Sequence, residues 1–348
     1  MSGILRHSVM TLFASGLMSA AAAVHPASSN DSSAELAAGG LRLVYNAKIR
    51  MLSEDLYISP KQIRIRYVFQ NTSDQDQTIL VAFPLPALNM ADLSESGSGI
   101  ADYEVENFVR FKTVVDGRSV DVSVQHRAEI AGVDITDTIR RANIPFTPPG
   151  ERFMAALRNI TPEARDDLRG FGAIDWDSKW PRPAWTQKTT FYWKQTFPAG
   201  RETIVEHSYT PVTGGFFVSS QELKPFPEKN YRDRPQSEID MARAAWSYDA
   251  YCMDKSLVRG IAKRSQTKDS GIMAIGKPVE YILKTGANWS GEIGHFRLVI
   301  DKVSPNNLVT LCMNDIKKTG KTTFEVTRKN YSPDGNLKIL FLEFPDAQ

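Results

Sequence analysis

Apolar and polar residues alternate along much of this chain, and the alternation predicts strands more often than helices. Residues 62–70, Q-I-R-I-R-Y-V-F-Q, show it most clearly, because isoleucines and aromatic residues occupy one side of an extended chain and arginines the other. A period of two is typical of a strand with one buried face. Further strands are predicted at 41–45, 55–59, 78–83, 109–115, 119–124, 189–197 and 202–209, and then at 279–284, 295–301, 307–313, 323–328 and 337–344.

A helical period appears in fewer places. The S-S-A-E sequence at 32–35 matches a capping box and predicts a brief helical turn. Residues 128–142 are predicted to form a helix with isoleucine and valine on its apolar face. Residues 162–170 begin with proline and end with glycine, which is typical of helix ends. Residues 237–266 carry apolar side chains at spacings of three and four, with a possible break and cap at Asp254.

These elements predict a mainly β protein with two β-sandwich-like domains and intervening helices. The length of 348 residues agrees with two domains, since domains commonly contain about 100–200 residues. We expect an N-terminal sandwich at 30–227, with a helical insertion at 128–170. Residues 228–235 are charged and end on proline, and with the next residue they form the candidate linker, 228–236. Residues 237–348 would form a helix and the second sandwich.

The first residues have the features of a secretory signal peptide. After Arg6, residues 9–23 are apolar or small, and they end in an alanine run that offers an A-x-A cleavage signal. We therefore expect residues 1–29 to be removed, with cleavage between 23 and 29; a retained signal anchor is the alternative. No later apolar run has the roughly 20 residues that a membrane span needs. The mature protein is expected in the periplasm or outside the cell.

Net charge argues against one class of partner, and the cysteine count predicts a disulfide. The formal net charge is only +2, whereas a nucleic-acid-binding protein usually carries a strong excess of basic residues. Cys252 and Cys312 are the only cysteines, and in an exported protein an even pair predicts one disulfide. A reactive thiol and a two-cysteine metal site are the less favoured alternatives.

No motif for catalysis, metal binding or cofactor binding stands out. After the predicted cleavage the histidines are His126, His207 and His295, and none lies near another as zinc ligands usually do. A G-x-S-x-G sequence is absent, although a Ser-His-Asp triad assembled from distant residues stays open. We therefore predict no metal and no cofactor.

Tryptophans and acids gather between residues 171 and 197, which makes this segment the main candidate for ligand binding. Trp176, Asp177, Trp180 and Trp185 are the candidate residues. The favoured interpretation is structural: W-P-R-P-A-W is a rigid proline loop whose indoles cover a core. A ligand platform and a pair of catalytic carboxylates for glycoside hydrolysis are the two alternatives.

A glycine-rich loop at 285–295, T-G-A-N-W-S-G-E-I-G-H, lies between two predicted strands. Its glycines, Gly286, Gly291 and Gly294, match neither G-x-G-x-x-G nor the Walker A spacing, so a phosphate cradle is not supported. We interpret the loop as a long connection between strands, in which Trp289 folds back as a plug.

Several motifs together resemble one family. They are N-D-S-S-A-E-L, M-L-S-E-D-L-Y-I-S, V-F-Q-N-T-S, A-F-P-L-P, F-Y-W-K-Q-T-F-P-A-G, H-S-Y-T-P and the glycine-rich loop. The chain is similar to an uncharacterised family of bacterial exported proteins, domain of unknown function 4424, although Glu292 stands where we expect proline. The resemblance implies a bacterial exported protein and no particular activity. A fold-level likeness to vault/inter-alpha-trypsin-type sandwich domains implies an interaction module.

The leading functional hypothesis is therefore a non-catalytic cell-envelope or periplasmic protein that binds a protein or glycan partner. The enzyme alternative is a polysaccharide or cell-wall hydrolase that uses acids in the segment 171–197. A third possibility is a structural partner in a larger assembly.

Overall fold

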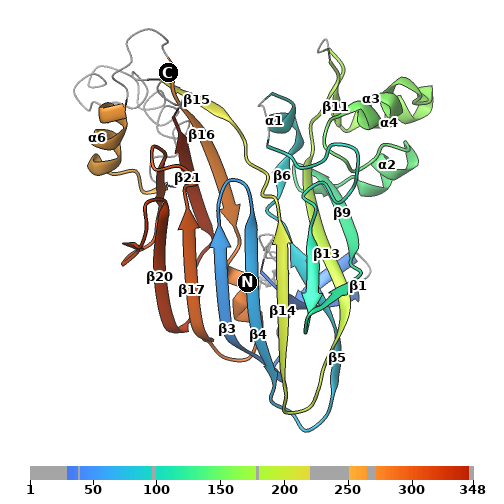
Figure 1. The fold of residues 1–348 in the computed structure, drawn as a ribbon. Coiled ribbons are helices and arrows are strands. Elements are labelled where there is room, and N and C mark those ends of the chain that lie inside the picture. Colours follow the sequence, from blue (N-terminus) through green and yellow to red (C-terminus); the bar gives the residue numbers. More distant parts are fainter. Residues whose placement is uncertain are drawn as a thin grey trace, which may run out of the picture.

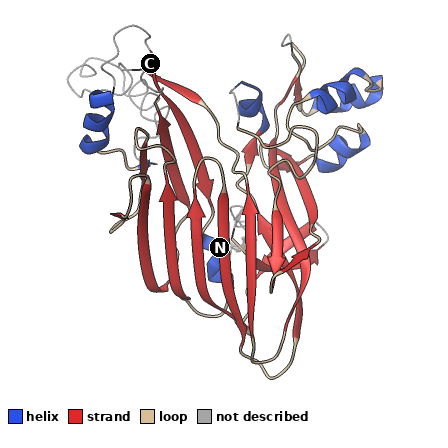
Figure 2. Ribbon diagram, viewed as in Figure 1, coloured by secondary structure: helices blue, strands red, loops and turns tan. Residues whose placement is uncertain are grey.

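The computed structural model describes residues 30–37, 40–95, 99–177, 180–219, 251–264 and 272–344. In these ranges the protein is mainly β, with several sheets and few helices, as predicted (Figure 2). The predicted signal peptide, 1–29, and the predicted linker, 228–236, lie outside the described residues.

An eight-stranded sheet forms the centre of the molecule (Figure 1). Its strands, in spatial order, are β19 (Lys317–Lys318), β20 (Thr323–Tyr331), β17 (Ile293–Asp301), β3 (Ile49–Ile58), β4 (Ile63–Asn71), β14 (Glu202–Tyr209), β7 (Lys112–Val115) and β8 (Arg118–Val120). Strand β17 pairs with β3 in parallel, and the other neighbours are antiparallel. Strands from both predicted domains therefore share one sheet.

Two further sheets cover different parts of the central sheet (Figure 1). One contains β1 (Ser32–Ala37), β2 (Gly40–Val44), β5 (Gln77–Pro84), β6 (Leu88–Asn89), β9 (Ser123–Ile130), β10 (Val133–Asp134) and β13 (Thr186–Phe197). The other contains β15 (Phe216–Ser219), β16 (Ile272–Tyr281), β18 (Leu308–Leu311) and β21 (Leu337–Glu343). Two sandwich-like units thus share the long central sheet.

Buried aromatic side chains hold these layers together. Phe111, beside β7, stacks on Phe191 of β13 with ring centroids 4.4 Å apart. On the other side, the hydroxyl groups of Tyr67 in β4 and Tyr281 in β16 lie 3.1 Å apart. Each large aromatic side chain that is removed from water contributes about 1.5–3 kcal/mol, so the continuous core across both units is a main source of stability.

A short 3-10 helix, η3 (Lys284–Asn288), lies next to β1, and the α-helices lie at one end of the molecule (Figure 1). They are α1 (Met90–Glu95), α2 (Thr136–Arg141), α3 (Glu151–Arg158), α4 (Pro162–Gly170) and α6 (Lys255–Arg264), and a short strand pair, β11 (Ile174–Asp175) with β12 (Arg182–Pro183), lies beside α3 and α4. The predicted helix at 162–170 is confirmed, and Thr161 caps it by accepting a hydrogen bond from the Ala164 N–H at 3.3 Å. None of the helices in the described part of the chain is long and apolar enough to cross a membrane.

Two helix predictions are wrong. Residues 128–134 belong to the β9–β10 hairpin, whose turn includes Ala131 and Gly132 at positive φ, and only Thr136–Arg141 of the predicted segment is helical. The capping-box segment at 32–35 is part of β1, which pairs with both β5 and β2. In each case hydrogen bonds to distant strands outweigh a weak local preference.

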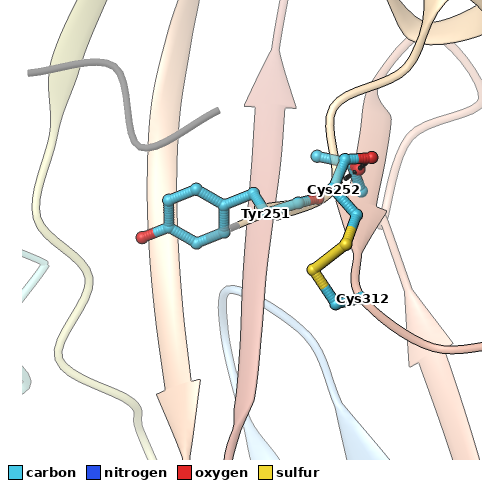
Figure 3. Close-up of a disulfide and its surroundings, with 4 residues drawn as sticks. Tyr251, Cys252 and Cys312 are labelled. Carbon is cyan, nitrogen blue, oxygen red and sulfur yellow. Dashed lines mark hydrogen bonds between the residues drawn. A yellow bond between two sulfur atoms is a disulfide. The ribbon is translucent and has the colours of Figure 1, made fainter. Parts of the chain in front are cut away.

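The predicted disulfide between Cys252 and Cys312 is present (Figure 3). It joins the segment before α6 to the residue that follows β18. Thr310 of β18 strengthens this junction by donating its hydroxyl to the carbonyl oxygen of Tyr251 at 2.7 Å. Asp254 accepts the Leu257 N–H at 2.8 Å and caps α6 at the predicted break. Residues 237–250 and 265–266 of the predicted long helix lie outside the described residues.

Candidate functional site

The tryptophan-rich segment contributes two of its candidate residues to the core. Trp185 is 0% exposed and packs near Phe153, with ring centroids 6.2 Å apart. Trp176 is half-buried, and the guanidinium of Arg165 lies 4.5 Å from its ring. These indoles belong to the core beneath α2, α3 and α4.

The other two candidates are on the surface. Trp180 is 66% exposed, and Asp177 is exposed as well. The nearby Asp175 forms an ion pair with Arg182 at 2.9 Å. The four candidate residues therefore do not lie together on one exposed face, and the structure offers no aromatic platform built from all three indoles.

The glycine-rich loop lies against the start of the described chain. Trp289 is 1% exposed, packs on Phe69 at a centroid distance of 4.8 Å, and donates its indole N–H to the carbonyl oxygen of Asp31 at 2.8 Å. Gly294 has no room for a side chain, because a Cβ there would lie 2.7 Å from the Leu52 carbonyl oxygen. Gly291 has a φ of +75°, which favours glycine.

Gly286 lies at the same junction, where a Cβ would approach the Asn30 amide at 3.0 Å. The loop thus provides the surface on which the N-terminal segment is seated.

The N-terminal segment continues into a group of buried polar side chains, which we call the N-terminal cluster. Its members are Asn30, Asp31, Glu54, Tyr67, His207 and Tyr281. Asn30 donates to Glu54 at 3.1 Å, and the Tyr281 hydroxyl donates to the other Glu54 oxygen at 3.2 Å. Burial raises the pKa of Glu54 to about 8, and it also raises the pKa of Asp31, against the lowering effect of His207.

Thr113, His207 and Asp31 are arranged like the nucleophile, the base and the orienting carboxylate of a catalytic triad. Nε2 of His207 lies 3.0 Å from the Asp31 carboxylate, and Nδ1 lies 3.1 Å from the Thr113 hydroxyl. The side chains of Asp31 and His207 have no exposed surface. A substrate has no access to this arrangement, so its role is structural. Residue spacing gave no sign of it, because Asp31 and His207 are 176 residues apart.

An open groove of about 860 Å³ lies on the outer face of the central sheet, and we call it the sheet groove. Strands β3, β4, β14, β7 and β17 form it, and the segment that follows β7 lines one side. Its charged and polar lining residues are Asp55, Tyr57, Arg64, Arg66, Lys112, Thr113, Ser119, Asp121, Glu206, His207, Ser208 and Arg297. Thr113 and His207 border the groove, but their side chains are buried beneath its floor. Sequence analysis missed this site, because an alternating strand shows which residues face outward but not which strands are neighbours.

Charges of opposite sign alternate across the groove. In the strand register, Arg297 lies opposite Asp55, Asp55 opposite Arg66, and Arg66 opposite Glu206. The first pair is 3.1 Å apart and the last 4.0 Å apart. Such half-exposed pairs contribute only about 0–1 kcal/mol each to stability. The Arg66–Glu206 pair can thus exchange partners with a charged ligand at small energetic cost, whereas Arg297 is also held by two hydrogen bonds to Glu325 at 3.0 Å.

Tyr57 is the aromatic lining residue whose side chain reaches the surface of the groove, because Phe111 and His207 are buried. The guanidinium of Arg64 lies 4.2 Å from its ring centroid, and its hydroxyl donates to Asp301 at 2.9 Å. One face of the ring is therefore covered, which leaves the groove dominated by charge rather than by aromatic stacking.

Metal-binding chemistry finds no support in the described residues. In these ranges no three His, Cys, Asp or Glu side chains lie close enough together to hold a metal ion.

Comparison with known proteins identifies a family but no activity. The model of the family described as Domain of unknown function (DUF4424) matches residues 29–340. No curated protein matches the sequence. A crystal structure of a candidate nutrient-binding protein from Legionella pneumophila is similar at 15% identity and a TM-score of 0.41, covering 90% of this chain and 70% of the other. A likeness at this level carries no conclusion about function.

Proposed function

This chain belongs to the DUF4424 family, whose description names no activity, and we propose that it is an exported, non-catalytic protein of the cell envelope that binds a partner in its sheet groove. The observation that carries the proposal is the row of alternating charges, Arg297, Asp55, Arg66 and Glu206, across an open groove of about 860 Å³. Complementary charges of this kind specify and orient a partner.

A protein segment fits the groove better than a glycan. Glycan sites commonly stack sugar rings on exposed aromatic faces, whereas the Tyr57 ring is covered on one face by Arg64. Charges of both signs instead match a polypeptide that carries acidic and basic side chains. We therefore propose a protein partner, and we treat glycan binding as the alternative outcome of the experiment below.

The chemistry of the carboxyl groups supports binding rather than hydrolysis. A glycosidase needs an accessible carboxyl group with a raised pKa. In the described residues a raised carboxyl pKa is found at Asp31 and Glu54, and both side chains are buried. In the segment 171–197, two of the three indoles that would flank a sugar lie against the core.

Export is part of the proposal and rests on two observations. The Cys252–Cys312 disulfide fits an oxidising compartment, where such bonds persist. Asn30 is buried, and its backbone N–H donates to the Thr285 hydroxyl at 2.9 Å, so a signal peptide would have to end before this residue. We propose a periplasmic or extracellular location after cleavage between 23 and 29.

Blocking the groove tests the proposal. Ser208 is a small, half-buried lining residue, so Ser208→Trp would fill the groove without removing a charge. The wild-type protein, immobilised and exposed to periplasmic extract and to a glycan array, should retain a specific protein that Ser208→Trp does not retain. Ser123→Trp is the matched control, because Ser123 is exposed on β9 of another sheet and lies outside the groove.

Two results would contradict the proposed function. If Ser208→Trp retained the same partner as the wild-type protein, the groove would not be the binding site. Turnover of a cell-wall or polysaccharide substrate that Asp177→Asn abolished, with folding intact, would favour the hydrolase instead.

A further inference from the structure

A second cavity lies next to β9 and α2, far in sequence from the groove strands β3 and β17. We call this cavity of about 570 Å³ the β9 pocket. Its lining includes His126, Arg127, Thr136, Thr138, Arg140 and Arg141. Strand β9 pairs with β13 along one side, whereas β10 covers only its end at Glu129 and Ile130. The pocket therefore lies beside an edge that the short strand β10 leaves largely uncovered.

His126 is an unusual component of this pocket, because one of its ring nitrogens has no partner. The residue is 4% exposed, and its ring is stacked near Phe146 at 5.5 Å and 11°. Nδ1 lies 3.0 Å from the Thr189 hydroxyl and 3.5 Å from the side-chain nitrogen of Gln187, both on β13. Nε2 is buried and has no hydrogen-bond partner in the protein.

One contact of Nδ1 indicates the tautomer of His126. The Gln187 amide nitrogen, 3.5 Å away and at the outer limit of a hydrogen bond, only donates and so pairs with an acceptor Nδ1, whereas the Thr189 hydroxyl can donate or accept. The ring proton then resides on Nε2 when the imidazole is neutral. Burial, with a smaller effect from the charge of Arg140, lowers the pKa of His126 to about 4, so the ring is neutral at pH 7. His126 thus holds a buried N–H donor that lacks an acceptor.

The pocket also carries an excess of positive charge. Its guanidinium groups belong to Arg127, Arg140 and Arg141, and its carboxylates to Asp134 and Asp137. Arg127 pairs with Asp134 at 2.5 Å, and Arg140 pairs with Asp137 at 3.3 Å on the exposed surface.

Arg141 donates to the Thr138 hydroxyl at 3.2 Å. Three cations against two anions leave a net charge of +1 beside the unpartnered donor of His126.

We propose that the β9 pocket binds an oxyanion group, a phosphate or a carboxylate, of a small ligand through the guanidinium groups of Arg140 and Arg141 and the Nε2–H of His126. Planar guanidinium groups match the oxygens of both anions. Nε2 is buried in the protein alone, so side chains at the pocket must shift to admit the ligand, and the bound oxygen then supplies the acceptor that Nε2–H lacks. This site is separate from the sheet groove, so the inference does not depend on the proposed function.

Titration with inorganic phosphate and with malonate, at constant ionic strength and pH 7, tests the inference. Long-range ¹H–¹⁵N spectra of the full chain should show a saturable shift of the His126 Nε2 resonance with at least one of the two anions. The double variant Arg140→Gln/Arg141→Gln should bind that anion at least tenfold more weakly. Both side chains are on the surface of α2, so the variant should fold.

Arg158→Gln is the matched control, because Arg158 is exposed on the neighbouring helix α3 and pairs there with Glu151. It should bind the anion as the wild-type protein does. The inference would be overturned if neither anion moved the His126 resonance. Equal affinity in the double variant and in the control would overturn it as well. The two anions distinguish a phosphate ligand from a carboxylate ligand.

Discussion

The Asp31 carboxylate lies 3.0 Å from Nε2 of His207, and neither side chain has any exposed surface. Asp31 belongs to the first residues that the structure describes, whereas His207 is on β14 of the central sheet. This contact makes the N-terminal segment a part of the core. A buried pair of this kind need not stabilise the protein relative to an apolar pair, but the loss of one partner leaves the other without compensation.

Removal of the Asp31 carboxylate should therefore destabilise the protein strongly. We expect Asp31→Ala to lower the free energy of unfolding by about 3–5 kcal/mol, measured by urea denaturation at pH 7. Asp55→Ala is the control, because Asp55 forms a half-exposed pair with Arg297 and should lose only about 0–1 kcal/mol. Similar losses of unfolding free energy in the two variants would show that the buried Asp31–His207 contact contributes no more to stability than a half-exposed ion pair.

Glu54 should make stability depend on pH. Its pKa is raised to about 8 in the folded protein, above the ordinary value of 4.5, so folding favours the protonated form. The stability that this group contributes is fully present below pH 4.5 and declines as the pH rises through 8, by at most about 1.4 kcal/mol per pH unit.

The measurement is urea unfolding of the wild-type protein and Glu54→Gln at several values between pH 5 and pH 8. The variant keeps the shape of the side chain and cannot ionise, so its stability should fall less over this range. Because Asp31 is also buried with a raised pKa, some decline should persist in the variant. Identical pH profiles would contradict the prediction.

Substitution by alanine should lower the free energy of unfolding strongly at Trp289 and hardly at all at Trp180. Trp289→Ala would remove a buried indole that packs on Phe69 and donates to Asp31, and we expect a loss of about 3–5 kcal/mol in unfolding free energy. Trp180→Ala changes a side chain that is 66% exposed and should stay within about 0.5 kcal/mol. Thermal or urea denaturation measures both losses. A large loss for Trp180→Ala would contradict the exposed position of Trp180.

The disulfide should stabilise the end of the molecule that contains α6. It links residues 60 apart in sequence, and a closed loop of this length contributes about 4 kcal/mol in the chain-entropy model. The double variant Cys252→Ala/Cys312→Ala should be less stable by roughly that amount, with faster hydrogen exchange in β18 and α6. Dithiothreitol should destabilise the wild-type protein and leave the variant unchanged. If the Cys252→Ala/Cys312→Ala variant were as stable as the oxidised wild-type protein, the disulfide would not stabilise the fold.

Processing of the N-terminus provides a separate test of export. N-terminal sequencing of the mature protein from its native cell should give a first residue between 24 and 30, because Asn30 and Asp31 are needed in the core. An intact Met1 would support a retained anchor. Cleavage beyond Asp31 would remove the partner of His207 and contradict the assigned role of the N-terminal cluster.

Much of the fold could be predicted because strands leave a local pattern. The alternation at 62–70 matches β4, whose inward side chains Ile63, Ile65, Tyr67 and Phe69 are all buried. The proline and glycine at the ends of 162–170 correctly bounded α4. The prediction for 128–134 was wrong because its isoleucine and valine suit either a helix face or a strand, and only the pairing of β9 with distant β13 decides between them.

The sequence by itself determined the strand-rich class, the disulfide pair and the family, because these depend on local periodicity, on composition and on long matching motifs. Only the tertiary structure decided that β17 joins β3 in one central sheet, that Asp31 meets His207, and that Arg297, Asp55, Arg66 and Glu206 form one row. The physical reason is that strand order and register come from contacts between segments far apart in the chain. Local periodicity shows which face of a strand is buried but contains no record of its neighbours.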